Sequence, residues 1–313
     1  MARLRRLASC CSISLIRDLP RLDSHQRSCE DVAPLIMHLT HIPVYVVARC
    51  CEASARFFAY ASSFFDGLLP ALLSPPEITS RVIHAYDTVY TAEATIHARD
   101  VVIDESLDAW ETSVLDSYKI CSGRMLVLGS GWGREAFAIA RRGITVVGID
   151  ANAAAVRTAQ TRATAIDVSA RFHQANFIDL PYKPRSFDWA FLASIMYSAV
   201  PGRNVRQAWL RSIQQCLTED GLVILSFTRE YSPPTRARTL LSHFNVFVST
   251  LPGANSACQP GDRYATGHFL HAFQSEEDIR NELTEAGAII KELSWIHCYA
   301  VVSFPAREHH PSA

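Results

Sequence analysis

The chain has 313 residues, of which 49% are hydrophobic and 19% charged, and its formal net charge is -1. This composition supplies enough apolar surface for a sizeable core and excludes a disordered polymer. The nearly neutral balance lacks the basic excess that is typical of nucleic-acid-binding proteins, so we expect no nucleic-acid partner.

Nine cysteines are spread along the chain, including the adjacent pairs Cys10-Cys11 and Cys50-Cys51. No Cys-x-x-Cys pair and no Cys/His spacing typical of a zinc site occurs, so we expect no metal. An odd number of cysteines in a chain of this length favours reduced thiols in a cytoplasmic protein over a disulfide framework.

Residues 1–108 are expected to form a mostly helical N-terminal extension. Their basic, mildly apolar start imitates a signal peptide but has no convincing cleavage site, so we expect the first part to be disordered. Residues 44–73 are the most apolar part, yet charged side chains interrupt them and Gly67 and Pro70 should bend them. These residues therefore make a poor transmembrane span.

Two interpretations of residues 44–73 remain. They form either a helical hairpin packed on the main domain or an amphipathic element that contacts a membrane surface peripherally. Packing is favoured, because aromatic residues at helical spacing usually face a core. The following Ser74-Pro75-Pro76 marks a break, and a second helix is expected from Ile78 to about Asp100.

From about residue 109 to the end, short apolar strands alternate with amphipathic helices. Strands are expected at 124–128, 144–149, 170–173, 187–193, 222–228, 288–293 and 298–304, and helices at 132–142, 152–163, 205–217 and 276–286. Such alternation implies parallel strands with right-handed crossovers. The fold class is therefore α/β, with a doubly wound sheet.

A glycine-rich turn joins the first of these strands to the first helix. Gly129, Gly131 and Gly133 stand between the two elements. Glycine allows left-handed backbone conformations and lets a ligand touch the main chain. The free N–H groups and the dipole of the helix behind the turn suit a carboxylate or a phosphate.

The spacing of these glycines distinguishes between ligands. The dinucleotide fingerprint requires Gly-x-Gly-x-x-Gly, and Arg134 occupies the position of its last glycine. Asp150 ends the second strand, where a carboxylate can accept hydrogen bonds from both ribose hydroxyls. The pattern thus favours a nucleoside-containing ligand without a pyrophosphate, and an NAD-type oxidoreductase is a less favoured alternative.

The segment Leu128-Gly-Ser-Gly-Trp-Gly133 resembles motif I of class I S-adenosylmethionine-dependent methyltransferases of the small-molecule type. Further segments resemble the same family in the same order: 140–143, 147–150, 176–181, 186–191, 217–222 and 273–287. The resemblance covers about residues 110–304. It implies a methyltransferase domain at 109–313 with a Rossmann-like, seven-stranded sheet and an antiparallel last strand, and S-adenosyl-L-methionine as the cofactor.

The resemblance also implies the roles of single residues. Gly129 and Gly131 flank the methionine part of the cofactor, Asp150 binds the ribose, and Asn176 faces the adenine amino group. Phe177 or Ala151 packs on the adenine ring. The expected cofactor-binding residues are Gly129, Ser130, Gly131, Gly133, Asp150, Ala151, Asn176 and Phe177.

Two positions depart from the family pattern. The family usually has an acid two residues before the first glycine, where this chain has Val127, and often has Asp where Asn176 stands. An amide oxygen still accepts a hydrogen bond, so the second change is mild. Glu135 either substitutes for the missing acid or stabilises the start of its helix. Because of Val127, a non-catalytic module that binds S-adenosylmethionine is an alternative to an enzyme.

Catalytic residues cannot be read directly from such a sequence, because methyl transfer from a sulfonium mainly requires alignment and exclusion of water. After the fourth strand, residues 192–197 lack the Asn- or Asp-Pro-Pro-aromatic run of amino-methylating nucleic-acid enzymes. We therefore expect a small-molecule acceptor. Tyr197, expected at the mouth of the site, and His268 are the candidate catalytic residues, although a structural role is favoured for both.

A long connection, residues 229–274, is expected to form a lid-like insertion over the transferred methyl group. It contains His243, His268 and His271. The N-terminal helical zone is expected to complete the wall of the pocket beside the lid. Its aromatic content favours an acceptor with an apolar body.

Overall fold

The computed structural model describes residues 33–97, 106–176, 178, 180–230, 236–265 and 267–305. The chain divides into two compact units, Met1–Ala59 and Tyr60–Ala313. This division lies well before the expected boundary at residues 108 and 109, because the second N-terminal helix packs on the α/β unit. The expectation of a disordered start concerns residues that lie outside the described ranges.

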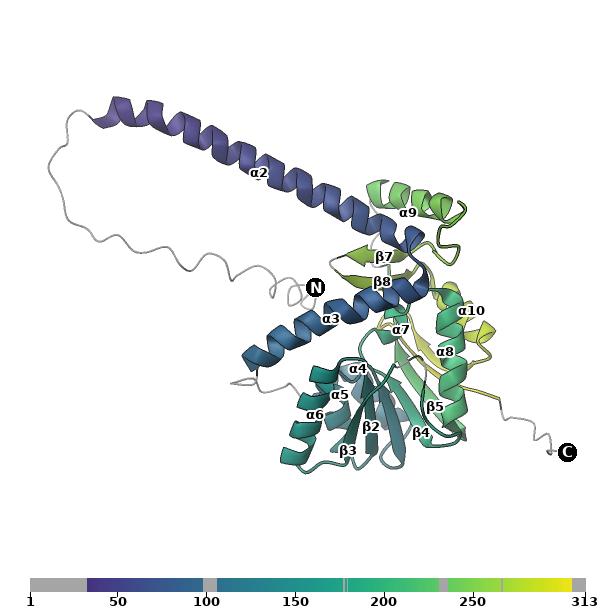
Figure 1. Cartoon of the computed structure of the whole chain (residues 1–313). Helices are drawn as coiled ribbons and strands as arrows, with labels where there is room; N and C mark the ends of the chain where they lie inside the picture. The colour runs from purple at the N-terminus through teal and green to yellow at the C-terminus, as the bar shows by residue number, and fades with distance from the viewer. Residues whose placement is uncertain are drawn as a thin grey trace. The chain divides into compact units, whose positions relative to one another are not determined.

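Helix α2, Ala33–Leu72, is continuous (Figure 1). The helix runs through Gly67 and Pro70 without interruption. Near its C-terminal end, in the second unit, Phe64, Phe65 and Leu72 are exposed. Leu69 and Leu73, the residue that follows the helix, are partly buried against a small core around Ile78.

Seven strands form the main sheet, in the order β3-β2-β1-β4-β5-β10-β9. Strands β1 to β5 are parallel, and β10 is antiparallel to both of its neighbours, as predicted. The strands are β1 (Arg124–Leu128), β2 (Thr145–Asp150), β3 (Ala170–Gln174), β4 (Phe187–Leu192), β5 (Leu217–Ser226), β9 (Ile289–Ser294) and β10 (Tyr299–Ser303). The carboxyl ends of β1, β2 and β4 thus meet at one edge of the sheet.

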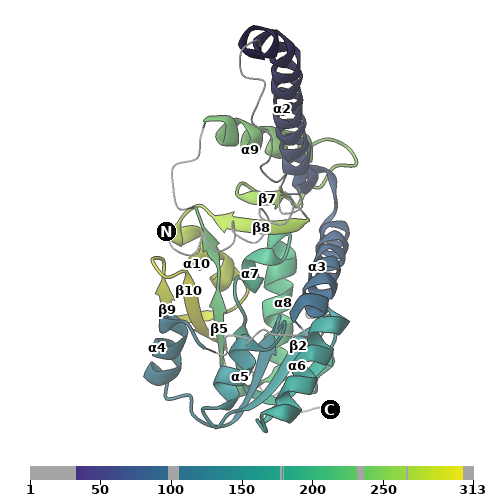
Figure 2. The same ribbon diagram turned by 90° about the vertical axis from the view of Figure 1, so that its left-hand side faces the viewer.

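Helices cover both faces of this sheet (Figure 2). One face is covered by α4 (Ala109–Ser117), α5 (Arg134–Ala140) and α6 (Ala153–Ala165), and the other by α8 (Arg203–Cys216) and α10 (Glu276–Glu285). Each helix buries the stripe that its 3.6-residue period predicts. In α8, for example, Trp209 and Ile213 are fully buried. Helix α4 was not predicted.

Helix α3, Pro75–His97, begins where the Ser-Pro-Pro break predicts. The Ser74 hydroxyl donates to Oε2 of Glu77 at 2.6 Å, and the Ser74 N–H donates to the same oxygen at 2.8 Å. These bonds fix the first turn of the helix. Farther along, α3 packs against α6 and β8.

The insertion at residues 229–274 has regular structure of its own. Strands β6 (Thr228–Arg229), β7 (Asp262–Ala265) and β8 (His268–Phe273) form a small sheet in the order β6-β8-β7, and α9 spans Arg236–Ser249. A separate small core joins Tyr264 and Phe269 of this sheet to Ile78 of α3. Within the described ranges, no helix is both long and apolar enough to cross a membrane.

Candidate functional site

A cleft of about 180 Å³ opens at the carboxyl edge of the main sheet. The ends of β1 and β2 supply one wall, the segment that follows β4 supplies a second, and α3 supplies a third. The lining residues are Thr79, Val82, Ile83, Tyr86, Gly129, Asp150, Ala151, Asn152, Ile178, Ala193, Ser194, Ile195, Met196, Ala199, Val200 and Pro201. In doubly wound sheets, ligands bind at this edge.

The glycine turn has the geometry that the sequence predicts. Gly129, Gly131 and Gly133 have φ values of 70°, 51° and 95°, in the left-handed region. A Cβ atom on Gly129 would lie 2.7 Å from Sδ of Met196, and one on Gly133 would lie 2.6 Å from the Phe137 ring. Both the backbone conformation and the close approach therefore require glycine here.

Asp150 lies at the end of β2 and links the glycine turn to the next loop. Its Oδ2 accepts the Gly131 N–H at 2.8 Å, and its Oδ1 accepts the Asn152 N–H at 2.8 Å. Burial raises the pKa of Asp150 above its ordinary value, while these N–H groups oppose the rise. Asp150 lines the cleft, and its carboxylate retains acceptor capacity for a further donor.

Asn152 connects this loop to α3. Its Oδ1 accepts the Ala155 N–H at 2.7 Å and caps α6, and its Nδ2 donates to Asp87 of α3. Asn152 is itself buried. The α3 wall is thus fastened to the residues that surround the Asp150 carboxylate.

Tyr86 lies on the same wall. Burial, and then the charge of Asp150, raise the pKa of the Tyr86 hydroxyl. Behind Tyr86, the ring of His268 packs edge-to-face at 4.7 Å between centroids. Among the described residues, no group hydrogen-bonds the buried Nδ1 of His268, and burial lowers the pKa of that imidazole. His268 is therefore separated from the cleft by Tyr86.

Tyr197 does not lie at the mouth of the cleft. It belongs to α7 (Met196–Ala199), is fully buried, and donates a hydrogen bond to Oε1 of Glu282 at 2.8 Å. The same carboxylate pairs with the fully buried Arg206 at 2.7 Å. The Tyr197 ring stacks on Phe273 in the core, so its position matches the structural role.

The insertion does not line the cleft in the way that was expected. Of its described residues, none belongs to the lining, and α3 occupies that side instead. The insertion packs against α3, because a Cβ atom added to Gly267 of the insertion would lie 2.6 Å from the Cβ of Ala85 in α3. His271 pairs with Asp262 at 2.7 Å, and His243 is exposed on α9. The lid role of residues 229–274 stays a prediction.

Two further predicted cofactor residues, Ser130 and Asn176, are not among the described residues that line the cleft. Ser130 is buried beneath the turn, and its Oγ has no hydrogen-bond partner in the described part of the chain. Asn176 is exposed and accepts the Ile178 N–H at 3.1 Å, and Ile178 rather than Asn176 lines the cleft. Phe177 lies outside the described residues.

A charged cluster underlies the glycine turn. Arg134 reaches Oε1 of Glu135 at 2.5 Å and Oε1 of Glu111 at 3.2 Å, and both carboxylates are buried. Burial raises the pKa of Glu111 to about 7. Glu135 also accepts the hydroxyl of Ser194, a lining residue, at 3.5 Å, whereas Val127 is fully buried in the sheet. Sequence reasoning missed Glu111 because α4 was not predicted.

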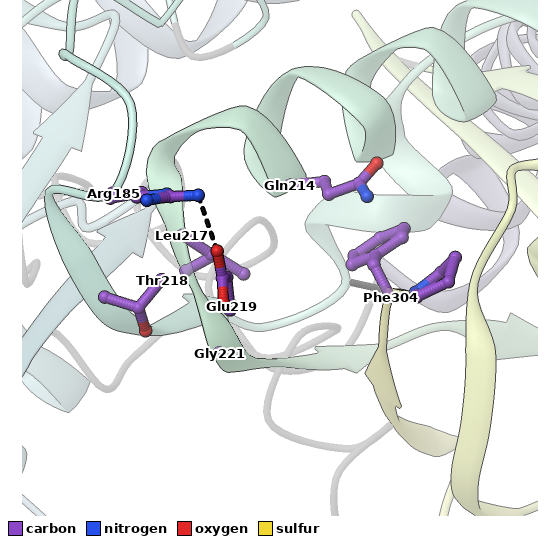
Figure 3. A pocket seen from close by; sticks show the side chains of 8 residues that line it. Arg185, Gln214, Leu217, Thr218, Glu219, Gly221 and Phe304 are labelled. Atoms are coloured by element: carbon purple, nitrogen blue, oxygen red, sulfur yellow. Dashed lines mark hydrogen bonds and ion pairs between the residues drawn. The ribbon is translucent and has the colours of Figure 1, made fainter. Parts of the chain in front are cut away.

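A second pocket, of about 20 Å³, lies at the opposite edge of the sheet (Figure 3). It is lined by residues at the start of β5 and just after β10, and an ion pair between Arg185 and Glu219 at 2.5 Å spans one side. A pocket of this size holds about one water molecule, so the larger cleft is the candidate site.

Comparison with known proteins supports the same assignment. Residues 125–221 match the family model described as a methyltransferase domain. A protein of Geobacillus sp. (strain WCH70) that is named as a methyltransferase is 31% identical over 148 residues. That match covers 45% of this chain and spans 59% of the relative's length.

A solved structure shares the fold. The chain superposes on a Burkholderia thailandensis 1,6-didemethyltoxoflavin-N1-methyltransferase, crystallised with its acceptor and S-adenosylhomocysteine, with a TM-score of 0.51 and 14% identity. The superposition covers 74% of this chain and 89% of the other. The sheet topology and the match of residues 125–221 to the methyltransferase-domain model agree with the resemblance that the sequence motifs carry.

Proposed function

We propose that the protein transfers a methyl group from S-adenosylmethionine to a small-molecule acceptor with an apolar body. This proposal rests on the difference between the two walls of the cleft. A glycine turn and the Asp150 carboxylate stand on the sheet side, and an apolar wall from α3 stands on the other. One side suits a nucleoside with a charged tail, and the other suits an apolar compound.

The residues present fit the cofactor. The glycine turn leaves no Cβ where the ligand must approach, and the Asp150 carboxylate lies in the cleft lining as an acceptor for ribose hydroxyls. Ala151 follows it in the lining and suits an adenine ring. Roles for Ser130, Gly133, Asn176 and Phe177 rest on the family resemblance. When bound, the cofactor supplies an electrophilic methyl group on a sulfonium.

The acceptor is proposed to bind between α3 and the segment after β4. The apolar side chains of this part of the lining are Val82, Ile83, Met196 and Val200. The Thr79 hydroxyl donates to the Pro75 carbonyl at 2.9 Å. These side chains hold an apolar body and exclude water from the reacting atoms. The Burkholderia methyltransferase binds the small molecule 1,6-didemethyltoxoflavin, which supports the same class of acceptor here.

We assign no general base to the site. Tyr197 is buried and bonded to Glu282, and Tyr86 separates His268 from the cleft. Positioning of the acceptor beside the methyl group is then the main contribution of the chain, as in-line displacement allows.

The alternative is a module that binds the cofactor without turnover. Its motivation is Val127, which is fully buried and leaves the cleft without the acid usual in the family. Incubation with methyl-labelled cofactor and a metabolite panel separates the two functions. A labelled product supports transfer, and cofactor binding without any product supports the module.

Calorimetric titration tests the cofactor assignment first. We expect S-adenosylmethionine and S-adenosylhomocysteine to bind and NAD to give no heat of binding, because Arg134 replaces the last glycine of the dinucleotide fingerprint. Tight NAD binding without any response to the sulfonium cofactor would overturn the proposal. We also propose a cytoplasmic location, because an odd number of cysteines in a chain of this length favours reduced thiols over a disulfide framework.

A further inference from the structure

The outer surface of α9 carries a row of large apolar side chains. Leu240, Phe244, Phe247 and Leu251 have exposed fractions of 70%, 45%, 60% and 47%. Their spacing of four, three and four residues places them on one face of the helix and its continuation. These four residues are called the α9 stripe below.

The stripe is exposed although α9 is firmly attached through a different face. Asn245 is buried, and its side-chain amide donates to the Gly67 carbonyl at 2.7 Å. Leu241 also lies close to Gly67, since a Cβ atom added to Gly67 would lie 2.7 Å from Cδ2 of Leu241. A helix needs one apolar face to join a core. A second, exposed apolar face is a feature of surfaces that bind another apolar phase or molecule.

The adjoining end of α2 extends this apolar character. Phe64 and Phe65, which lie within one turn of Gly67 on the same helix, are 49% and 63% exposed. The aromatic residues that the sequence analysis expected in a core are therefore exposed beside the anchor point of α9. Packing within the described chain does not account for them.

The charge of the segment indicates what the stripe contacts. From Tyr231 to Gly261 the sequence contains no Asp or Glu, whereas Arg236 and Arg238 are the first and third residues of α9. The whole chain has a net charge of only -1, so this segment is a local basic region. An apolar helix face beside cations is typical of segments that lie in the interface of an anionic bilayer.

A second copy of the chain is a poorer occupant. Dimers of identical chains generally form around a two-fold axis, which brings the same surface of both copies together. A dimer through the stripe would place the basic segments of both copies at one interface, without carboxylates from residues 231–261 to offset them. We propose that the α9 stripe docks the protein on the surface of an anionic lipid bilayer.

Vesicle flotation with the full chain tests this proposal. The vesicles are phosphatidylcholine alone and phosphatidylcholine with about 30% phosphatidylserine. We expect binding to the anionic vesicles that weakens as salt is added, and at least about tenfold weaker partitioning of Phe247→Glu and Leu240→Glu. Val246→Glu is the matched control, because Val246 is also exposed (37%) on α9 but lies outside the stripe. It should stay within about twofold of the wild type.

Further readouts separate the other outcomes. Melting curves and S-adenosylhomocysteine affinity show whether each variant is folded, and Arg236→Gln with Arg238→Gln should reduce the preference for phosphatidylserine. Equal vesicle binding by Phe247→Glu and Val246→Glu, or no vesicle binding by the wild type, would overturn the proposal. A dimer that Phe247→Glu converts to a monomer, with no lipid binding, would assign the stripe to a second copy instead. None of these results depends on methyl transfer.

Discussion

The two walls of the cleft are specified in different ways. On the sheet side, the glycine turn, Asp150 and Asn152 lie within 24 consecutive residues, from Gly129 to Asn152, and their geometry follows from local sequence. On the other side, α3 comes from more than 40 residues earlier and is held by Ile78 in a small core with the insertion. A local motif can thus be identified from spacing, whereas a wall built by long-range packing cannot.

The largest expected effect comes from the sheet side. Gly131→Val should reduce cofactor affinity at least about 100-fold, because the side chain enters the space that the ligand needs and a φ of 51° is unfavourable for valine. The backbone strain alone costs about 1–2 kcal/mol of stability. Calorimetry measures the affinity, and thermal unfolding measures the strain.

Gly287→Val is the matched control for that variant. Gly287 also has a positive φ, of 88°, but nothing lies within 4 Å of its added Cβ. It should lose similar stability and keep full cofactor affinity. Normal binding by Gly131→Val would contradict the assignment of the glycine turn.

Asp150→Ala should weaken cofactor binding by about 1.5–3 kcal/mol, the range for charge-assisted hydrogen bonds. Part of this loss reflects the Gly131 and Asn152 N–H groups, which lose the acceptor that orders both loops. Because burial raises the pKa of Asp150, affinity should fall on acidification at a higher pH than an ordinary aspartate gives. Unchanged affinity in Asp150→Ala would mean that the ribose lies elsewhere.

These residues show which features of the structure can be predicted from the sequence. The positions of the strands and the glycine turn are predictable because strand patterns and turn chemistry are local, whereas the antiparallel β10 was implied by the family resemblance. Tyr197 was expected at the cleft because it follows a strand, but the buried Glu282 and Arg206, distant in sequence, turn it into the core. The N-terminal helical zone was expected at the wall of the pocket, but which α3 residues line it, and the burial of Glu111, depend on tertiary packing that no spacing rule in one sequence reports.

The charged cluster below the turn predicts a pH dependence of stability. The pKa of Glu111 is about 7 in the folded state, against 4.5 ordinarily, so the folded chain binds this proton more tightly than the unfolded chain. The resulting stability is fully present below about pH 4.5 and is lost as the pH rises through about 7. Its order of magnitude is about 1–3 kcal/mol.

Glu111→Gln should therefore flatten the dependence of the unfolding free energy on pH between about 5 and 8, as denaturant titrations at several pH values would measure. Glu277→Gln, at an exposed position on α10, provides the control and should leave the curve unchanged. A wild-type curve without a decline near neutral pH would show that Arg134 keeps Glu111 ionised in the folded state.

The smallest expected effect tests the α3 wall. Tyr86→Phe should weaken cofactor binding by about 0.5–1.5 kcal/mol, the value of one hydrogen bond, because the hydroxyl lies in the cleft within the electrostatic influence of Asp150. Thr79→Val, on the same face of α3 but bonded to Pro75, should leave cofactor affinity unchanged. Equal losses in both variants would show that α3 acts on the cofactor only through packing.

Hydrogen exchange with and without S-adenosylhomocysteine tests the central claim most directly, because it reports where along the backbone the cofactor binds. We predict slower exchange in peptides covering Gly129–Gly133 and Asp150–Asn152, little change in α9, and no change anywhere on addition of NAD. Protection confined to other parts of the chain, with Gly129–Gly133 and Asp150–Asn152 unaffected at saturating ligand, would contradict the account.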